Sequence, residues 1–252
     1  MRLRQVALAS TNLDAVTAAF AEVFGLKVAY NDPHIDHYGL KNAVISAGTG
    51  FLEVVEPIAD NASAGRFLNR RGGDAGYMLI IQVADAGAEI DRVKGLGVRV
   101  VDEIDRKDYK AAHFHPADFG GVLASFDQQR SEADFLKPYG DWMPAGADWR
   151  DTRTDEVLDL TAVTLTHPDP DALARRYAEL LGRPLDAANP RRLPMDHGEM
   201  LFAVSDQPVT SVAGVTLKVR DPEAALARAR AKGIDVNAEG VLIGGMRFKP
   251  TA

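Results

Sequence analysis

The chain has 252 residues, 46% of them hydrophobic and 26% charged, and its net charge of −7 argues against a protein that binds a nucleic-acid backbone through a basic face. The absence of cysteine excludes disulfides, thiolate metal ligands and cysteine nucleophiles. The N-terminus lacks the apolar core of a signal peptide and no apolar run is long enough for a membrane span, so we expect a cytoplasmic protein without membrane contacts.

The N-terminal segment predicts a strand followed by a capped helix. The strand covers residues 3–9, and Asn12 can accept a hydrogen bond from the first helical turn. Apolar side chains then recur on one helix face, at Val16, Ala19, Phe20, Val23 and Phe24. Gly25 is typical of the residue in left-handed backbone conformation that ends a helix. Two further strands are expected at 41–47 and 50–56.

The next segment has the same order of elements. A strand is expected at 77–83, Asp85 caps a helix that runs to Lys94, and Gly97 follows it. Three further strands are expected, at 98–103, 110–115 and 122–127.

Residues 129–157 form a connector. They are polar, contain proline and glycine, and show no periodicity. Because large aromatic side chains are usually buried, Trp142 and Trp149 indicate that the connector packs against the rest of the chain.

The remaining residues repeat the pattern of the first part. Asn12, Asp14, Phe20, Glu22 and Gly25 correspond at one constant offset to Asp169, Asp171, Tyr177, Glu179 and Gly182. Asp169 and Asp221 are expected to cap helices that start with proline, after strands at 160–166 and 214–219. Later strands are expected at 199–204, 235–238 and 242–249. The chain therefore predicts four βαβββ units in two pairs.

These features resemble the vicinal oxygen chelate superfamily, which includes glyoxalases, bleomycin-resistance proteins and dioxygenases. The resemblance is carried by QVALASTNLDAVTAAFAEVFGLKV, FLEVVEP, HFHPADFGGVLASFD and TAVTLTHPDPDALARRYAELLGRPL. It implies an α+β fold in which each pair of units forms a curved, cup-like mixed sheet with helices outside. The first domain would cover 1–128, with an epimerase-like character, and a second, degenerate domain would cover 158–252.

Catalytic members of the superfamily bind a divalent metal through four inward side chains at equivalent strand positions. In the first half these positions fall on Gln5, Glu53, Met78 and Ser125, of which only Glu53 is a strong ligand. In the second half the matching positions include Ala162, Phe202 and Gly214. We therefore expect no cofactor; a divalent metal, if one binds, would be held weakly by Gln5, Glu53 and His115.

Glu53 is the candidate general base, because a carboxylate on an apolar strand has a raised pKa when it faces a cup. Its alternative interpretation is a solvent-facing strand residue. His113 and His115 are candidate catalytic residues, since residues two apart on a strand share a face. Their alternative interpretation is an exposed strand end that leads into a turn.

Gln5, Ser125, Met78 and Phe51 are the expected substrate-binding residues, and they would form a small polar patch on an apolar wall. The sequence NRRGGD, at 69–74, is interpreted as a basic loop that either is solvated or binds a carboxylate or a CoA phosphate.

Several functions stay open at this point. The resemblance implies a lyase or isomerase of the glyoxalase I or methylmalonyl-CoA epimerase kind, acting on a small carbonyl or acyl-CoA-type metabolite. The alternative is a metal-free protein of the bleomycin-resistance type that binds or sequesters a small molecule. An extradiol dioxygenase is disfavoured, because its two-histidine, one-carboxylate set is missing. The expected partner is a small-molecule ligand, and the chain would be a monomer or homodimer.

Overall fold

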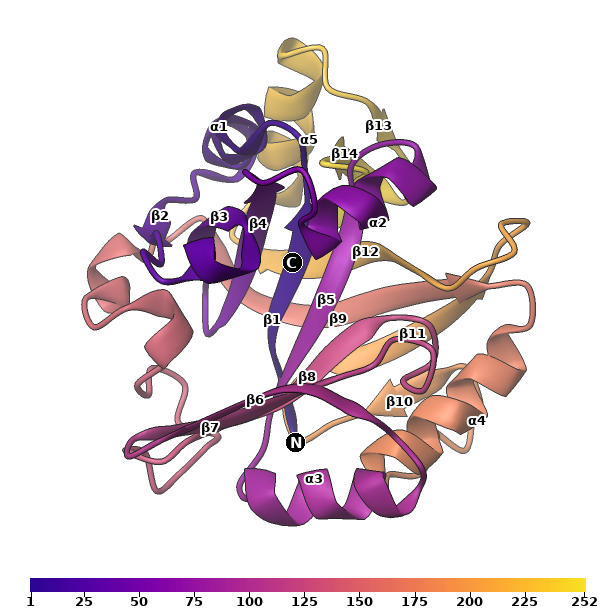
Figure 1. Cartoon of the computed structure of the whole chain (residues 1–252). Coiled ribbons are helices and arrows are strands. Elements are labelled where there is room, and N and C mark those ends of the chain that lie inside the picture. The colour runs from indigo at the N-terminus through magenta and orange to yellow at the C-terminus, as the bar shows by residue number, and fades with distance from the viewer.

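The computed structural model describes residues 1–252 and has an α+β architecture (Figure 1). The first half contains β1 (Arg2–Ala9), α1 (Leu13–Phe24), β2 (Val28–Tyr30), the 3-10 helix η1 (Ile35–Tyr38), β3 (Leu40–Ala47), β4 (Gly50–Pro57), α2 (Ser63–Arg71), β5 (Ala75–Gln82), α3 (Ala86–Gly95), β6 (Val100–Arg106), β7 (Tyr109–Phe114) and β8 (Leu123–Gln129). The connector carries the 3-10 helices η2 (Met143–Ala145) and η3 (Trp149–Thr152). The second half contains β9 (Val157–His167), α4 (Pro170–Leu181), β10 (Arg192–Pro194), β11 (Glu199–Val204), β12 (Ser211–Val219), α5 (Pro222–Ala231), β13 (Val236–Asn237), β14 (Gly240–Ile243) and β15 (Met246–Thr251).

The predicted helix caps are confirmed. Asn12, Asp85, Asp169 and Asp221 each accept a hydrogen bond from the backbone N–H three residues ahead, at 2.9–3.0 Å. Each side chain satisfies one of the backbone donors that the first turn of a helix leaves unpaired. Local sequence therefore fixes where α1, α3, α4 and α5 begin.

The strands form one continuous 15-stranded sheet with two curved parts, one for each half of the chain, which are called the first and the second sheet below. The first has the order β2-β3-β4-β1-β5-β8-β7-β6, with antiparallel β1 and β5 at its centre. The second has the order β10-β11-β9-β12-β15-β14-β13, around antiparallel β9 and β12. The sheets meet where β5 pairs with β12 through Gly76 and Val212. A Cβ atom on Gly76 would lie 2.3 Å from the Val212 carbonyl oxygen, so the contact requires glycine.

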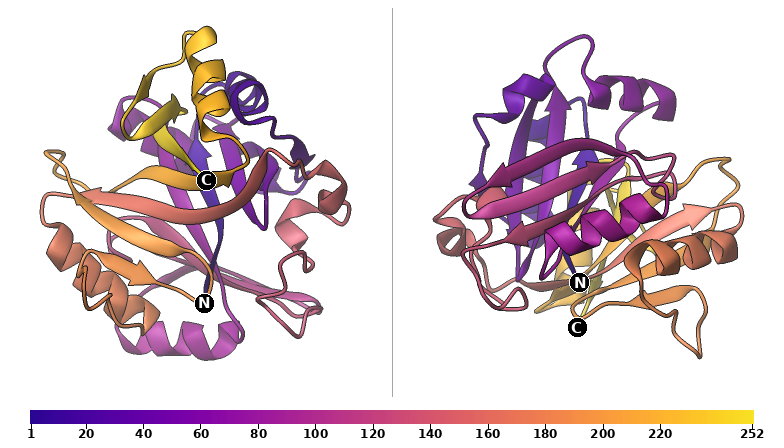
Figure 2. Two further views of the ribbon diagram at one scale, coloured as in Figure 1. Left: turned by 180° about the vertical axis from the view of Figure 1, so that it is seen from behind. Right: turned by 60° about the horizontal axis from the view of Figure 1, so that its bottom comes forward.

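The two halves share one apolar core. A single cluster of 51 buried residues includes side chains from both sheets, so neither sheet buries its apolar face alone. Phe20 of α1 meets Phe248 of β15 edge to face, with ring centroids 4.8 Å apart. Four helices lie outside the sheets and pair between halves, α1 with α5 and α3 with α4, whereas α2 packs beside the concave face of the first sheet (Figure 1). Seen from behind, the second-half strands cover the first sheet (Figure 2).

The connector packs against the concave face of the first sheet, and Trp142 and Trp149 are both fully buried there. Arg4 of β1 is buried beneath it, with its guanidinium 5.0 Å from the Phe51 ring centroid and 5.2 Å from that of Trp142. Arg4 donates to the carbonyl oxygens of Thr49 at 2.6 Å and Gly140 at 3.3 Å. A buried cation is therefore held by carbonyl oxygens and aromatic faces, with no carboxylate in contact.

The structure corrects four details of the sequence-based prediction. The NRRGGD segment is not simply a loop, because Arg70 and Arg71 form the last turn of α2, which ends at Gly72 with φ 76°. The single strand predicted at 242–249 is a hairpin, because Gly244 and Gly245 take positive φ and reverse the chain. The third unit has two strands after its helix instead of three. The short strand β2 was not predicted.

None of the helices has the length and apolar character needed to span a membrane.

Replacing Arg4 with alanine is expected to destabilise the fold by about 3 kcal/mol, because it leaves a void between three aromatic rings and removes the donor that Gly140 uses. The measurement is urea unfolding followed by tryptophan fluorescence. Arg220, an exposed arginine on the second half, gives the control: R220A should cost less than about 0.5 kcal/mol. Equal effects of the two variants would contradict the role given to Arg4.

Candidate functional site

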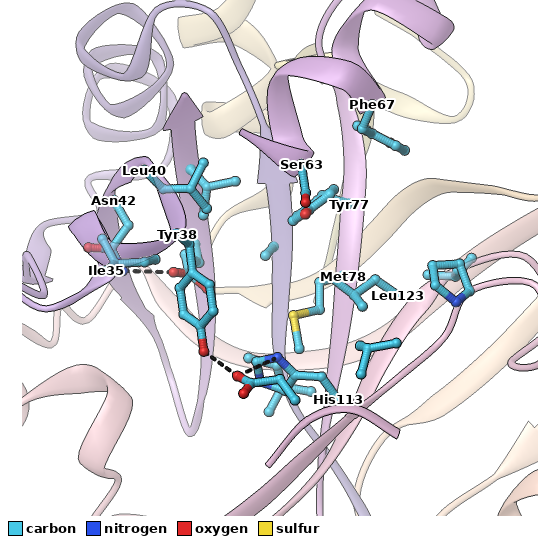
Figure 3. A pocket seen from close by; sticks show the side chains of 18 of the residues that line it. Ile35, Tyr38, Leu40, Asn42, Ser63, Phe67, Tyr77, Met78, His113 and Leu123 are labelled. Atoms are coloured by element: carbon cyan, nitrogen blue, oxygen red, sulfur yellow. Dashed lines mark hydrogen bonds and ion pairs between the residues drawn. The ribbon is translucent and has the colours of Figure 1, made fainter. Parts of the chain in front are cut away.

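The concave face of the first sheet opens into a cavity of about 2120 Å³. The cavity is larger than the roughly 300–1000 Å³ of most small-molecule sites, so it has room for an elongated ligand. Figure 3 shows Met78 in the middle of the cavity, with Tyr38 and His113 toward one end and Ser63 and Phe67 toward the other.

Glu53 of β4 lies on the floor of this cavity and is only 7% exposed. One of its oxygens accepts a hydrogen bond from Asn42 Nδ2 at 2.7 Å, and the other accepts from Gln5 Nε2 at 2.8 Å. Gln5 is itself held in place, because its Oε1 accepts from Trp142 Nε1 at 2.9 Å. The carboxylate is thus oriented by two neutral amides, one of which depends on the connector.

Burial raises the pKa of Glu53, and the hydrogen bonds from Asn42 and Gln5 offset only part of this effect. No cation contacts the carboxylate. A carboxyl group with a raised pKa is a stronger base than an exposed one, which suits proton abstraction from carbon.

A second buried carboxyl group, Asp127, lines the cavity from β8. Burial raises its pKa to about 7, and Glu53 adds to the shift through charge repulsion, while the Tyr109 hydroxyl donates to Asp127 and opposes it. The Asp127 Oδ1 atom is buried without a hydrogen-bond partner. Asp127 is therefore present in both protonation states near neutral pH.

His113 of β7 lines the same cavity with its side chain 22% exposed. Its Nδ1 lies 3.7 Å from Asp102 of β6, which also accepts a hydrogen bond from the Tyr38 hydroxyl (Figure 3). Burial lowers the pKa of His113, and Asp102 counteracts this in part, so the imidazole is neutral at pH 7. This cluster joins η1 to the β6–β7 hairpin across the cavity.

A family model described as a glyoxalase-like domain matches residues 6–181 of the chain. The chain belongs to this family, within the vicinal oxygen chelate superfamily. A curated relative, the ethylmalonyl-CoA/methylmalonyl-CoA epimerase of Cereibacter sphaeroides, is 27% identical over 131 residues, which are 50% of this chain and 97% of the relative.

Part of the chain is also similar to solved structures of methylmalonyl-CoA epimerases. The Streptomyces coelicolor enzyme, in complex with 2-nitronate-propionyl-CoA, is 22% identical with a TM-score of 0.47, covering 51% of this chain and 97% of that one. The Mycobacterium tuberculosis enzyme is 23% identical with a TM-score of 0.46, covering 50% and 87%. These epimerases match about half of this glyoxalase-like chain.

The residues at the superfamily's metal positions do not fit a divalent ion. The Gln5 oxygen, its only ligating atom, is occupied by the Trp142 indole N–H, and both Glu53 oxygens already accept from amides. Met78 offers a soft thioether and Ser125 a neutral hydroxyl. No three His, Asp or Glu side chains converge anywhere in the chain.

The structure brings most of the predicted site residues to one cavity. Glu53, Gln5, Met78 and His113 line it, and so does His115. His115, however, lies beyond the last residue of β7, where its Nδ1 lies 3.2 Å from a guanidinium nitrogen of Arg99 and accepts from the Ala117 N–H. The expectation that the two histidines share one strand is therefore corrected.

Two predicted substrate-binding residues do not reach the cavity. Phe51 is fully buried beneath the connector, stacked with Trp142 at 6.4 Å between ring centroids. Ser125 is also fully buried, although it lies between Ile80 and His113 on neighbouring strands of the concave face. Packing of neighbouring side chains, which strand periodicity does not reveal, covers both residues.

Sequence reasoning missed three residues of the site. Asp127 follows Ser125 by two positions, so strand alternation already placed both on one face. Asn42 also lies on a predicted strand, but only its pairing with β4 brings it to Glu53. Trp142 had no local signal for a role in the site beyond its expected burial.

Asp127→Asn should remove much of the pH dependence of stability. The raised pKa of Asp127 means that the folded state keeps its proton up to about pH 7, so stability gained at low pH is lost as pH rises from about 4 to 7. The shift from 3.8 to about 7 corresponds to about 4 kcal/mol. Urea unfolding at pH 5 and pH 8 should show a smaller loss for D127N than for the parent chain; an equal loss would place the titration elsewhere.

Proposed function

We propose that this glyoxalase-like protein is an isomerase or lyase that moves a proton at the carbon next to the carbonyl group of a small carbonyl or acyl-CoA compound, with Glu53 as the base. The observation that carries the proposal is a buried carboxyl group with a raised pKa, fixed by two neutral amides on the floor of an open cavity. Neutral donors orient the carboxylate without the charge compensation that would weaken it as a base.

Proton donors lie on the other side of the central strands from Glu53. His113 on β7 is neutral at pH 7, and Asp127 on β8 is partly protonated. In the proposed reaction Glu53 takes the proton from carbon, and a donor from β7 or β8 stabilises the oxyanion that develops on the substrate. Isomerisation then follows in one of two ways: Glu53 gives its proton to a neighbouring carbon, or a donor from β7 or β8 protonates the original carbon from the opposite side and Glu53 keeps the abstracted proton.

The similarity to an ethylmalonyl-CoA/methylmalonyl-CoA epimerase supports an isomerase acting on an acyl-CoA compound. That similarity covers only half of the chain, so the substrate itself is part of the proposal.

A second candidate function is metal-free binding of a small molecule. It is favoured by the poor ligand set at the family's metal positions and by the apolar side chains that line the cavity beside Glu53, among them Met78, Ile80 and Leu123. In that case Glu53 would accept a hydrogen bond from the ligand and no proton would leave carbon.

Glu53→Gln should lower proton transfer by about 10²-fold to 10⁴-fold, because the amide keeps the shape of the side chain and cannot act as a base. The measurement is exchange of the proton next to the carbonyl for deuterium, followed by NMR in heavy water across a panel of acyl-CoA thioesters and small α-substituted carbonyl compounds. Unfolding in urea should show that E53Q is at least as stable as the parent, since a buried ionisable group has been removed.

Glu223 is exposed on α5 and has no bonded partner, so E223Q is the matched control and should exchange at the parental rate. Exchange that survives in E53Q at the parental rate would remove Glu53 from the mechanism. Tight binding without exchange by the parent, for every compound of the panel, would favour the binding function.

Trp142→Phe should move the acid limb of the rate profile to higher pH and slow exchange by about tenfold. Without the indole N–H, Gln5 is no longer fixed, and Glu53 loses a donor that stabilises its charged form. A purely structural role for Trp142 predicts lower stability with the acid limb unmoved. Exchange rates between pH 4 and pH 8 separate the two interpretations.

A further inference from the structure

The charges that line the cavity are strongly separated along its length. Five carboxylates, Asp32, Asp36, Asp102, Glu103 and Asp105, lie at the end formed by η1 and the β6–β7 hairpin. At the other end, α2 supplies three of the four lining arginines, and no lining carboxylate comes from α2, from the loop before β8 or from the second half. On a chain of net charge −7, this basic end of the cavity is suited to bind an anion.

The α2 arginines are arranged differently from one another. Arg71 donates to Ser211 Oγ at 2.7 Å and to the Thr210 carbonyl, which ties α2 to the second half. Arg66 contacts only uncharged groups beside it, Ser63 Oγ and the Asn61 carbonyl. Arg70 is exposed and has no hydrogen bond or ion pair with the protein. Two guanidinium groups at the cavity therefore keep donors available for a ligand.

These arginines are electrostatically connected to the floor of the cavity through Tyr77. Burial raises the pKa of Tyr77, the charge of Glu53 raises it further, and Arg66 and Arg70 oppose both. Tyr77 packs edge to face on Phe67 of α2, with ring centroids 5.1 Å apart. Tyr77 and Phe67 thus form an aromatic part of the cavity wall beside α2 (Figure 3).

We propose that the α2 end of the cavity is a subsite for the phosphate groups of an elongated ligand, contacted by Arg66 and Arg70, whose reactive end lies at Glu53. Guanidinium groups bind phosphate oxygens with paired N–H donors, and the cavity volume exceeds what a small carbonyl compound needs. Arg71 is a positioning residue that holds α2 against the second half. The subsite adds detail to the proposed function. Only the placement of the ligand's reactive end at Glu53 rests on that function.

The test measures binding of free coenzyme A, pantetheine and inorganic phosphate to the full chain by calorimetry, at low and at physiological salt. The variant is R66A/R70A. The control is R175A/R230A, which removes the same charge from two exposed arginines that are outside the cavity and have no bonded partner. Thermal unfolding followed by circular dichroism verifies that both double variants are folded, and R70A alone provides a milder change.

The parent and the control should bind coenzyme A with an affinity that falls as salt rises, and R66A/R70A should bind it about tenfold or more weakly with a flatter salt dependence. Pantetheine, which lacks the nucleotide phosphates, should bind all four proteins equally. Equal coenzyme A affinity in R66A/R70A and the control, or no coenzyme A binding by the parent, overturns the subsite. Competition by phosphate alone at the same concentration as coenzyme A would assign the site to free phosphate and also overturn the elongated ligand.

E53Q separates this inference from the proposed function. The subsite predicts that E53Q binds coenzyme A with parental affinity, whatever happens to proton exchange. If E53Q loses proton exchange while coenzyme A binding still depends on Arg66 and Arg70, both proposals are supported. If E53Q exchanges protons normally and binding still depends on these arginines, only the role of Glu53 is contradicted.

Discussion

The packing of the connector on the first sheet determines the shape of the site. Arg4 lies at the centre of this contact, with its guanidinium over the rings of Phe51, Trp142 and Trp149 and its two terminal nitrogens donating to backbone carbonyls. Burial of a cation is costly unless its donors are satisfied. Both terminal nitrogens of this guanidinium have acceptors, whereas its Nε is buried without one. The connector thus closes one side of the cup and leaves the other side open as the cavity.

The same contact links stability to chemistry. Trp142 is held by stacking, and its indole N–H reaches Gln5, whose amide in turn reaches Glu53. In the metal-binding members of the superfamily, a cation would hold the side chains at the positions that correspond to Gln5 and Glu53. In this chain a neutral hydrogen-bonded chain fixes them, so the carboxyl group keeps a raised pKa that a nearby cation would lower.

The second half contributes to the site from its outer edge. Its apolar sheet face completes the shared core, and Thr210 together with Leu173 lines the outer part of the cavity. Arg71 joins α2 to that edge. The second half thus borders the cavity at its edge and supplies no polar group near Glu53. Its strand positions that match the superfamily's metal positions carry Ala162, Phe202 and Gly214.

The sequence by itself determined the local elements and the main candidate residues. Helix starts followed from Asn12, Asp85, Asp169 and Asp221, because a cap is a contact within one turn. The carboxylate of Glu53 and the loss of the metal positions followed from matching single residues to a known pattern. Asp127 could also have been predicted, because strand alternation places it on the same face as Ser125.

Only the tertiary structure decided which of these side chains meet. Asn42 and Trp142 reach the Glu53 network from positions 11 and 89 residues away from it, and no periodicity encodes such contacts. The covered positions of Phe51 and Ser125, and the charge separation along the cavity, likewise arise from how distant segments pack. Local propensity acts over a few residues, whereas burial and electrostatics depend on every neighbour in space.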